Sequence, residues 1–160
     1  MYMHPRSIFC FTGASSRPKR DVLTTSVVAF HAVLGGAETA NLGIHQNIPF
    51  PLELLNIGDS YENAHHRFIA SISGVYVFSV TLLSYNHFPS SVVGNLVKNE
   101  AVLARVLAQG DEGRHDQCSV TVTVLLQDGD QVWVDIRGPE NASIYGDHYT
   151  SFTGFLLAQM

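Results

Sequence analysis

The sequence predicts an all-β fold, a two-sheet sandwich or jelly roll in a single domain. From Thr24 onward, short segments alternate apolar and polar residues, which is the side-chain period of a β-strand. Turn-forming residues separate these segments about every dozen residues, which gives about eight to ten short strands. No segment is expected to form a helix that would cover a sheet face. With 160 residues, the chain is long enough for one proper core.

The first expected strand has one apolar face and ends at a glycine pair, Gly35-Gly36. That apolar face consists of Val28, Phe30, Ala32 and Leu34. A loop that contains Gly43 and Pro49 follows. Short extended segments are then expected near residues 50–55 and 66–71.

Two expected strands, residues 74–83 and 151–158, are apolar on both faces. In the first, Tyr76, Phe78, Val80 and Leu82 oppose Val75, Val77 and Leu83, with Ser79 and Thr81 among the latter. In the second, Phe152, Gly154 and Leu156 oppose Phe155 and Leu157. A sandwich leaves one side of each sheet in water, so we infer that a neighbouring subunit covers these outer faces. Burial by loops of the same chain is the alternative.

The remaining strands follow residue 91. Residues 100–108 have good helical propensity, but we predict a strand hairpin over 91–109 that turns at Lys98-Asn99, partly because of the family resemblance described below. Residues 119–126 are the clearest strand, because valines and leucine alternate with hydroxyl-bearing side chains. Asp128-Gly129 is expected to supply positive φ angles for a tight hairpin turn into a strand over 131–136.

The composition limits the classes of partner. Charged residues are only 14% of the chain, which suggests that copies of the chain cover part of its surface. The formal net charge is −5, and basic residues are scattered or confined to the N-terminus. Nucleic acids and anionic membranes are therefore disfavoured as partners. Residues 68–97 lack Asp, Glu, Lys and Arg, but their β-branched and aromatic residues predict sheet and no membrane insertion.

Residues 1–23 differ from the rest of the chain, because they lack hydrophobic periodicity. We expect a disordered leader or pro-segment there and a folded domain over residues 24–160. Arg17-Pro18-Lys19-Arg20 is expected to be a solvated basic linker, and the alternative is cleavage after Arg20, because the segment fits the pattern that secretory proprotein convertases cut. Cleavage would remove Cys10. No signal peptide is visible, because the apolar run over 8–11 is too short.

The sequence contains no pattern typical of a catalytic site. It lacks a Gly-x-Ser-x-Gly elbow, a protease-type cysteine and a phosphate-binding loop, and its carboxylates fall in turns, so we predict no enzymatic activity. The histidines lack zinc-motif spacing. His65 and His66 would leave an extended chain on opposite faces. The others singled out, His45, His87, His115 and His148, fall in separate loops.

Two positions are candidates for modification. Cys118 enters a strand and is expected to be a half-buried thiol, with an inter-chain disulfide as the alternative. Asn141-Ala142-Ser143 is an N-glycosylation sequon in an expected loop, which could carry a glycan if the chain is secreted.

Three groups of residues carry a family resemblance. The first is a spaced series of aromatic and small residues: Phe50, Asn56, Tyr61, Phe68, Gly74, Tyr76 and Phe78. The second is the turn Gly129-Asp130-Gln131-Val132-Trp133-Val134, and the third is the ending that holds Phe152, Gly154 and Phe155. Over residues 27–158 the chain resembles the globular head of the complement C1q family. It departs from that family's long signature at Val80, which replaces an aromatic residue.

The resemblance implies a jelly roll of two antiparallel sheets that assembles as a compact homotrimer. The aromatic series would then serve the core and not a ligand. No Gly-x-y repeat precedes the domain, so the chain is most similar to short, stalkless members from invertebrates, especially molluscs. Those members imply a secreted pattern-recognition lectin of innate immunity, which binds microbial glycans or polyanions through trimer surface loops. A tumour-necrosis-factor-like ligand for a cell-surface receptor is the alternative, and a matrix role is a third hypothesis.

The resemblance also bears on calcium, which several family members bind near the apex of the trimer. The loop before the last expected strand offers one carboxylate, Asp147. Calcium takes six to eight oxygen ligands, so Asp147 would need carbonyls, waters or symmetry mates as further ligands. We therefore expect Asp147 to shape the loop, and it stays the calcium candidate as the alternative. No other cofactor is expected.

Overall fold

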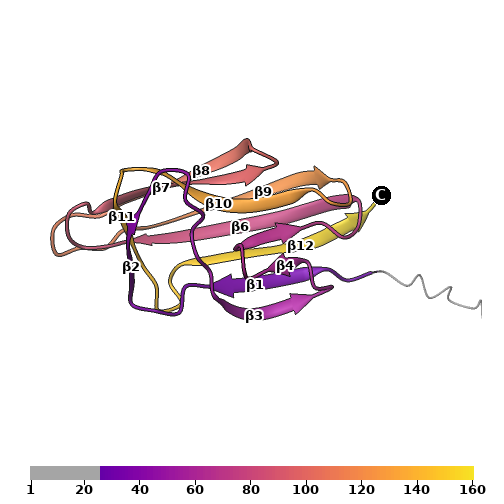
Figure 1. Ribbon diagram of the computed structural model, residues 1–160, viewed down its shortest axis with the longest axis horizontal. Helices are drawn as coiled ribbons and strands as arrows, with labels where there is room; N and C mark the ends of the chain where they lie inside the picture. The colour runs from indigo at the N-terminus through magenta and orange to yellow at the C-terminus, as the bar shows by residue number, and fades with distance from the viewer. Residues whose placement is uncertain (1–25) are drawn as a thin grey trace, which may run out of the picture.

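The structure is a computed structural model that describes residues 26–160. The predictions on residues 1–23, including the cleavage candidate Arg20 and Cys10, lie outside the described residues. All elements of the described part are β-strands (Figure 1). Residues 26–160 accordingly include no helix with the length and apolar character to cross a bilayer.

One layer is a seven-stranded antiparallel sheet in the order β2-β11-β6-β12-β1-β3, with β9 on the opposite edge of β6 (Figure 1). Its strands are β1 (Ala29–Val33), β2 (Glu38–Leu42), β3 (Leu52–Ile57), β6 (Gly74–Ser84), β9 (Gln117–Leu126), β11 (Ala142–Tyr145) and β12 (Ser151–Gln159). Strand β6 is the longest, with 11 residues, and it pairs with β9, β11 and β12. This sheet contains both strands that the sequence predicts to be apolar on two faces.

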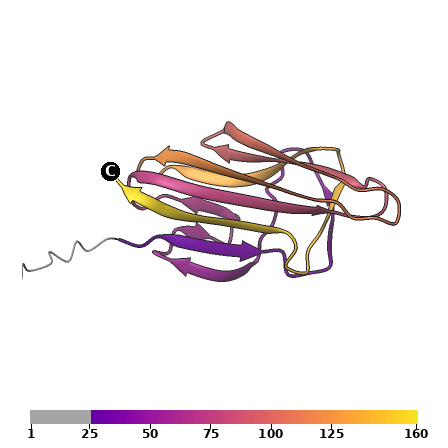
Figure 2. The ribbon, with the colours of Figure 1, turned by 180° about the vertical axis from the view of Figure 1, so that it is seen from behind.

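The other layer is a five-stranded antiparallel sheet in the order β4-β5-β10-β7-β8. Its strands are β4 (Tyr61–Glu62), β5 (Arg67–Ile69), β7 (Ser91–Lys98), β8 (Ala101–Gln109) and β10 (Gln131–Gly138). The two antiparallel sheets confirm the predicted jelly-roll sandwich. The C-terminus and the start of the described chain lie at one end of the sandwich, and the β6–β7 and β8–β9 loops lie at the opposite end (Figures 1 and 2).

The core lies between the two sheets and is built around aromatic rings. Seven rings are each at most 4% exposed: Phe30, Phe50, Tyr61, Phe68, Tyr76, Phe78 and Phe152. The predicted inward face of residues 74–83 is fully buried, and Val80 fills the position of the missing family aromatic with 0% exposure. Tight packing of this kind is what fixes one arrangement of the two sheets.

The predicted hairpin over 91–109 is confirmed as a strand pair, β7 and β8. Its turn lies one residue later than expected, at Asn99 and Glu100, which have φ angles of 45° and 74°. Strand geometry prevails over helical propensity because alternation buries Val106 and Ala108 while Arg105 and Leu107 stay exposed.

Two predictions about the strands are wrong. Residues 26–160 form twelve strands where eight to ten were expected, and the short strands β2, β4 and β11 are the ones that were not foreseen. The turn at Asp128-Gly129 does not form a hairpin, since β9 belongs to the seven-stranded sheet and β10 to the five-stranded sheet. Only Gly129 of the two has a positive φ, 87°. The turn therefore carries the chain from one sheet to the other.

Candidate functional site

The candidate site lies on the outer face of the five-stranded sheet, over its central strand β10. Alternate residues of this strand, Val132, Val134 and Ile136, are buried in the core. The intervening residues, Gln131, Trp133 and Asp135, therefore project from the opposite face. They form the floor of a cavity of about 470 Å³.

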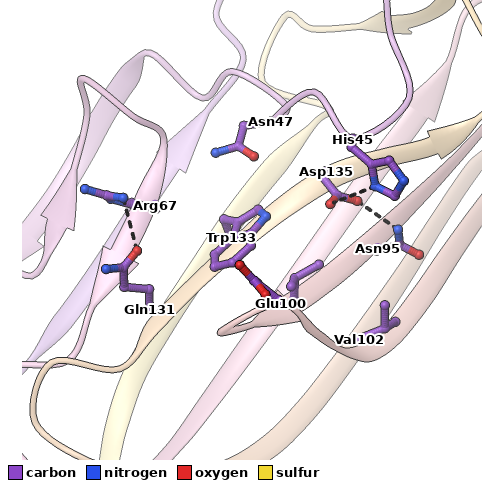
Figure 3. Close-up of a pocket in the computed structure, with 10 residues that line it drawn as sticks. His45, Asn47, Arg67, Asn95, Glu100, Val102, Gln131, Trp133 and Asp135 are labelled. Carbon is purple, nitrogen blue, oxygen red and sulfur yellow. Dashed lines mark hydrogen bonds and ion pairs between the residues drawn. The ribbon is translucent and has the colours of Figure 1, made fainter.

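The cavity forms where two segments share one edge of β10. Strand β5 pairs with residues 131–133, and residues 45–48 continue along residues 134–136. The backbone N–H of His45 donates to the carbonyl of Ile136 at 2.7 Å, and the N–H of Ile48 donates to that of Val134 at 2.8 Å. This arrangement brings ten residues together (Figure 3): His45, Asn47, Arg67, Asn95, Val97, Glu100, Val102, Gln131, Trp133 and Asp135.

Asp135 is the buried acid of the site, with only 7% of its surface exposed. Its Oδ1 accepts a hydrogen bond of 2.8 Å from the side-chain amide of Asn95. Arg105 Nε donates in turn to Asn95 Oδ1 at 3.2 Å. His45 Nδ1 lies 3.8 Å from Asp135 Oδ2, beyond hydrogen-bond distance (Figure 3). Within residues 26–160, Oδ2 accepts no hydrogen bond, so it is an available acceptor.

Arg67 of β5 is the cross-strand partner of Trp133 in β10, and it lies on the side of Trp133 away from Asp135. Its Nε pairs with the carboxylate of Glu62, and this hydrogen bond lowers the pKa of Glu62 below its usual range. A terminal nitrogen of Arg67 donates to Gln131 Oε1 at 3.0 Å, which fixes the Gln131 amide (Figure 3). The charge of Arg67 is thus already compensated, and its role in the site is to hold a neighbouring amide.

Trp133 is half-buried and lies between the Arg67–Gln131 pair and Asp135 (Figure 3). It is the only tryptophan of the chain. Val97 and Val102 add apolar surface, and Asn47 and Glu100 complete the lining. The lining contains no Ser, Thr or Cys nucleophile. The site therefore suits reversible binding of a ligand that combines a flat apolar face with polar groups at its edge.

Most of the family-motif residues come together in the core, away from this cavity. Phe50, Tyr61, Phe68, Tyr76, Phe78 and Phe152 pack on one another or on Phe30. Asn56 holds the Tyr61 backbone through two hydrogen bonds. The Tyr61 N–H donates to Asn56 Oδ1 at 3.1 Å, and Asn56 Nδ2 donates to the Tyr61 carbonyl at 3.0 Å. A Cβ at Gly74 would approach the Ala158 carbonyl to 2.4 Å, so that position requires glycine.

Two motif residues lie outside the core. Trp133 is in the cavity, and Phe155 is 44% exposed on the outer face of the seven-stranded sheet. The same alternation that buries Phe152 and Gly154 turns Phe155 outward. Membership of the motif therefore does not mean one structural role.

The other predicted positions lie in loops or at strand ends. Asp147 has a φ of 47° and its N–H donates to the Gly36 carbonyl at 2.8 Å, and no cluster of three potential metal ligands exists within residues 26–160. Calcium binding by Asp147 stays a prediction. Asn141 is exposed in the turn before β11, where a glycan could be attached. Cys118 is a half-buried thiol without a disulfide partner in the described chain.

The structure corrects one statement about histidines and adds a contact that two others share. His66 does not lie in an extended segment, because it has a φ of 54° in the turn between β4 and β5. His87 and His115 come from different loops but meet around Tyr85, with ring centroids 4.2 Å and 5.7 Å from it. No sequence spacing predicts this contact, since pairing of β6 with β9 creates it.

Sequence reasoning missed six polar or charged residues of the cavity: Asn47, Arg67, Asn95, Glu100, Gln131 and Asp135. One signal was present, because Gln131, Trp133 and Asp135 alternate along a predicted strand and so share a face. Asn95 and Asn47 gave no such signal, since only the strand register brings them beside Asp135.

The comparisons with known proteins give the family. Residues 29–157 match the family described as the C1q domain. Zebrafish (Danio rerio) Caprin-2 is 34% identical over 142 residues, which are 86% of this chain and 15% of Caprin-2. Mouse (Mus musculus) complement C1q tumor necrosis factor-related protein 2 is 30% identical over 113 residues, 69% of this chain and 37% of that protein. The chain thus matches well under half the length of these relatives.

Solved structures agree on the fold. The globular domain of zebrafish complement 1qA protein gives a TM-score of 0.68 at 18% identity, over 83% of this chain and 98% of that one. Eiger TNF from S. frugiperda also gives 0.68, at 12% identity, over 84% of this chain and 95% of that one. At these identities the likeness establishes the jelly roll and leaves the ligand open.

Proposed function

The chain belongs to the C1q domain family, and on that premise we propose that it is a secreted recognition protein of innate immunity. In this proposal it assembles as a homotrimer and binds glycans of microbial surfaces, without enzymatic activity. The observation that carries the glycan assignment is Trp133, half-buried on an outward sheet face between fixed amides and a carboxylate.

The cavity matches the chemistry of a sugar ring. A pyranose has an apolar face of C–H groups, which packs on the flat ring of Trp133. Its hydroxyl groups both donate and accept hydrogen bonds at the ring edge. Asp135 Oδ2 offers an acceptor. The side-chain NH₂ groups of Asn47 and Gln131 offer donors, and Gln131 is held in place because its Oε1 accepts a hydrogen bond from Arg67. Because these groups are already held by hydrogen bonds, little side-chain entropy is lost on binding.

Self-assembly is supported by the outer face of the seven-stranded sheet. Four adjacent strands, β9, β6, β12 and β1, contain no Asp, Glu, Lys or Arg. Their outer face exposes Leu125 by 48%, Phe155 by 44% and Leu157 by 60%. An apolar patch of this kind on a secreted protein calls for a partner, and a second copy of the chain is the simplest one. The Trp133 cavity is on the other sheet, so each subunit keeps its site and weak sites add in avidity.

A tumour-necrosis-factor-like signalling ligand is the second candidate. The fold shared with Eiger TNF supports it. Such a ligand would bind its receptor between subunits and would not need the cavity around Trp133. The two candidates therefore predict different consequences of changing that residue.

A glycan array followed by fluorescence titration tests the proposal. Trp133 is the sole tryptophan, so its emission reports directly on the cavity. A bound glycan is expected to shift or quench this emission, and Trp133→Ala is expected to weaken glycan binding at least about tenfold, equivalent to about 1.4 kcal/mol. Phe88→Ala is the matched control, because Phe88 is an aromatic side chain 93% exposed in the β6–β7 loop, outside the cavity.

Three results would count against the glycan assignment. One is an array without any bound glycan, and another is binding that leaves the Trp133 emission unchanged. The third is an equal loss of binding in Trp133→Ala and Phe88→Ala. Saturable attachment to host cells without glycan binding would support the signalling candidate. Repeating the array with a calcium chelator tests the predicted calcium binding by Asp147, because a calcium-dependent site would no longer bind its glycan.

A further inference from the structure

A second groove adjoins the Trp133 cavity on the same outer face. It has a volume of about 630 Å³ and is lined by Ser91, Val93, Arg105, Arg137, Gly138 and Pro139. These residues come from β7, β8 and β10, the three strands that also contribute to the cavity, and from the residue that follows β10. Both arginines are exposed.

The strand register places the groove directly beside the cavity. Asn95 of β7 is paired with Asp135 of β10 on one side and with Arg105 of β8 on the other. The hydrogen bonds from Arg105 to Asn95 and from Asn95 to Asp135 follow this row across the sheet. Arg137 lies two residues beyond Asp135 on β10. The row is therefore the boundary between the two hollows, with Trp133 on one side and Arg137 on the other.

The combined length of the two hollows exceeds one sugar ring. Trp133 and Arg137 are four residues apart on β10, which corresponds to about 14 Å at about 3.4 Å per residue. A ligand that contacts both is therefore a chain of several sugar units.

The groove is positively charged and its charge is not compensated. Among residues 26–160, neither Arg105 nor Arg137 forms an ion pair with an Asp or Glu. Arg67 and Lys98, in contrast, pair with Glu62 and Asp130. Only the Nε of Arg105 is engaged, by Asn95, so its terminal nitrogens stay available. Two guanidinium groups beside small or apolar residues suit a carboxylate, sulfate or phosphate.

Resting on the proposed glycan-binding function, we propose that the preferred ligand is an acidic oligosaccharide that occupies both hollows. One uncharged ring packs on Trp133, and the anionic substituent of a neighbouring unit binds between Arg105 and Arg137. The anion is excluded from the cavity itself, because Asp135 and Glu100 line it and the charge of Arg67 is compensated by Glu62. The charge pattern thus fixes which end of the ligand carries the acid.

Three polymers with one backbone test this proposal on the full-length protein: dextran, carboxymethyl dextran and dextran sulfate of equal chain length. The two acidic forms are expected to bind at least tenfold more tightly than dextran and to change the Trp133 emission. Higher salt is expected to reduce this preference, because it screens exposed charges. The carboxymethyl and sulfate arms identify which anion the arginines prefer.

Arginine variants separate the groove from general electrostatic attraction. Arg137→Gln is expected to lower the preference for the acidic forms and to retain any dextran binding, because no hydrogen bond within residues 26–160 joins the Arg137 side chain to the cavity. The double variant Arg105→Gln with Arg137→Gln is expected to remove the preference. Arg114→Gln, a charge change in the β8–β9 loop outside both hollows, is expected to retain the preference. Arg105, Arg114 and Arg137 are all exposed, so these substitutions are expected to leave the fold intact.

The proposal is overturned if the acidic dextrans bind no better than dextran, or if they bind without a change in Trp133 emission. It is also overturned if Arg114→Gln weakens their binding as much as the double variant does. These outcomes are distinct from failure of the proposed function. If neutral glycans on the array still change the Trp133 emission, the glycan assignment stands and only the acidic preference is wrong.

Discussion

The outer faces of the two sheets differ in the charged residues that they carry. In the seven-stranded sheet, β1, β6, β9 and β12 contain no Asp, Glu, Lys or Arg. Their exposed side chains are apolar or hydroxyl-bearing, apart from the terminal amides Gln117 and Gln159. Hydroxyl pairs join neighbouring strands, such as Thr81 with Ser119 at 2.8 Å and Thr121 with Ser79 at 3.0 Å. In the five-stranded sheet, every strand carries at least one charged residue.

This difference indicates separate roles for two faces that share one core. A sandwich fixes the inward residues of both sheets by packing, but it leaves the outward residues free to diverge. On the first face, the four adjacent strands β9, β6, β12 and β1 lack the charges that would oppose contact with another protein. The other retains charged and amide groups around Trp133. We therefore assign assembly to the first face and ligand binding to the second.

A charge on the uncharged face gives the largest expected effect. Phe155→Asp places a carboxylate in the centre of the proposed subunit contact, where it would be desolvated without a partner. Phe155 is 44% exposed and points away from the core, so the single chain is expected to remain folded. Sedimentation at micromolar concentration is expected to give a trimer for the unmodified protein and a monomer for the variant.

Leu107→Asp is the matched variant on the other sheet, since Leu107 is 48% exposed on β8. It is expected to sediment as a trimer. If the unmodified protein is a monomer, or if both aspartate variants dissociate alike, the division of roles between the two faces is wrong.

A change on the opposite side of the same strand separates assembly from folding. A Cβ added at Gly154 would lie 2.4 Å from Phe78 Cδ1 and 2.8 Å from Phe30 Cε1. Gly154→Ala is therefore expected to lower the free energy of unfolding by about 3 kcal/mol through overpacking. Urea denaturation measures this loss in the monomeric Phe155→Asp background, so that assembly does not contribute.

Gly36→Ala serves as the control for that experiment. A Cβ at Gly36 has no neighbour within 4 Å, so the substitution is expected to change the free energy of unfolding by less than about 0.5 kcal/mol. If both substitutions lower the free energy of unfolding equally, close packing against Phe78 is not the reason that position 154 needs a glycine.

Much of the fold could be predicted because its signals are local. The alternation of residues 74–83 depends only on neighbouring positions, and the structure gives β6 over Gly74–Ser84. Strands β2 and β11 were missed because each is short and is stabilised by pairing with the other. The turn at Asp128-Gly129 was misassigned because a turn sequence does not specify which sheet the next strand joins.

The candidate site was harder to predict than the core. The Trp133 motif was visible, but it indicated a structural role. The cavity needs residues 45–48 beside β10 and Asn95 beside Asp135, and both neighbours are brought there by long-range pairing. Buried apolar residues repeat along the chain with a period, whereas the polar residues of a site converge only in the fold.

The smallest expected effect concerns Asp130, in the turn that joins the two sheets. Its carboxylate accepts hydrogen bonds from the Gln127 N–H at 2.8 Å, from Lys98 Nζ at 2.9 Å and from the Asn99 amide at 2.7 Å. The Gln127 bond, followed by the one from Lys98, lowers the pKa of Asp130 from 3.8 to about 2. Asp130→Asn is expected to lower the free energy of unfolding at neutral pH by about 1 kcal/mol.

The pH dependence identifies the carboxylate as the cause. Because the pKa is lower in the folded chain, the ionised form favours folding, and its contribution is complete above pH 3.8 and is lost as the pH falls toward about 2. Urea midpoints measured over that range are expected to fall more steeply for the unmodified protein than for Asp130→Asn. Asp128→Asn makes the same charge change in the same turn, but in the described chain the Asp128 carboxylate accepts no hydrogen bond, so the steep fall is expected to persist. If Asp130→Asn retains that slope as well, the Asp130 carboxylate is not the group whose protonation lowers the stability over this range, and its charge does not stabilise the turn between β9 and β10.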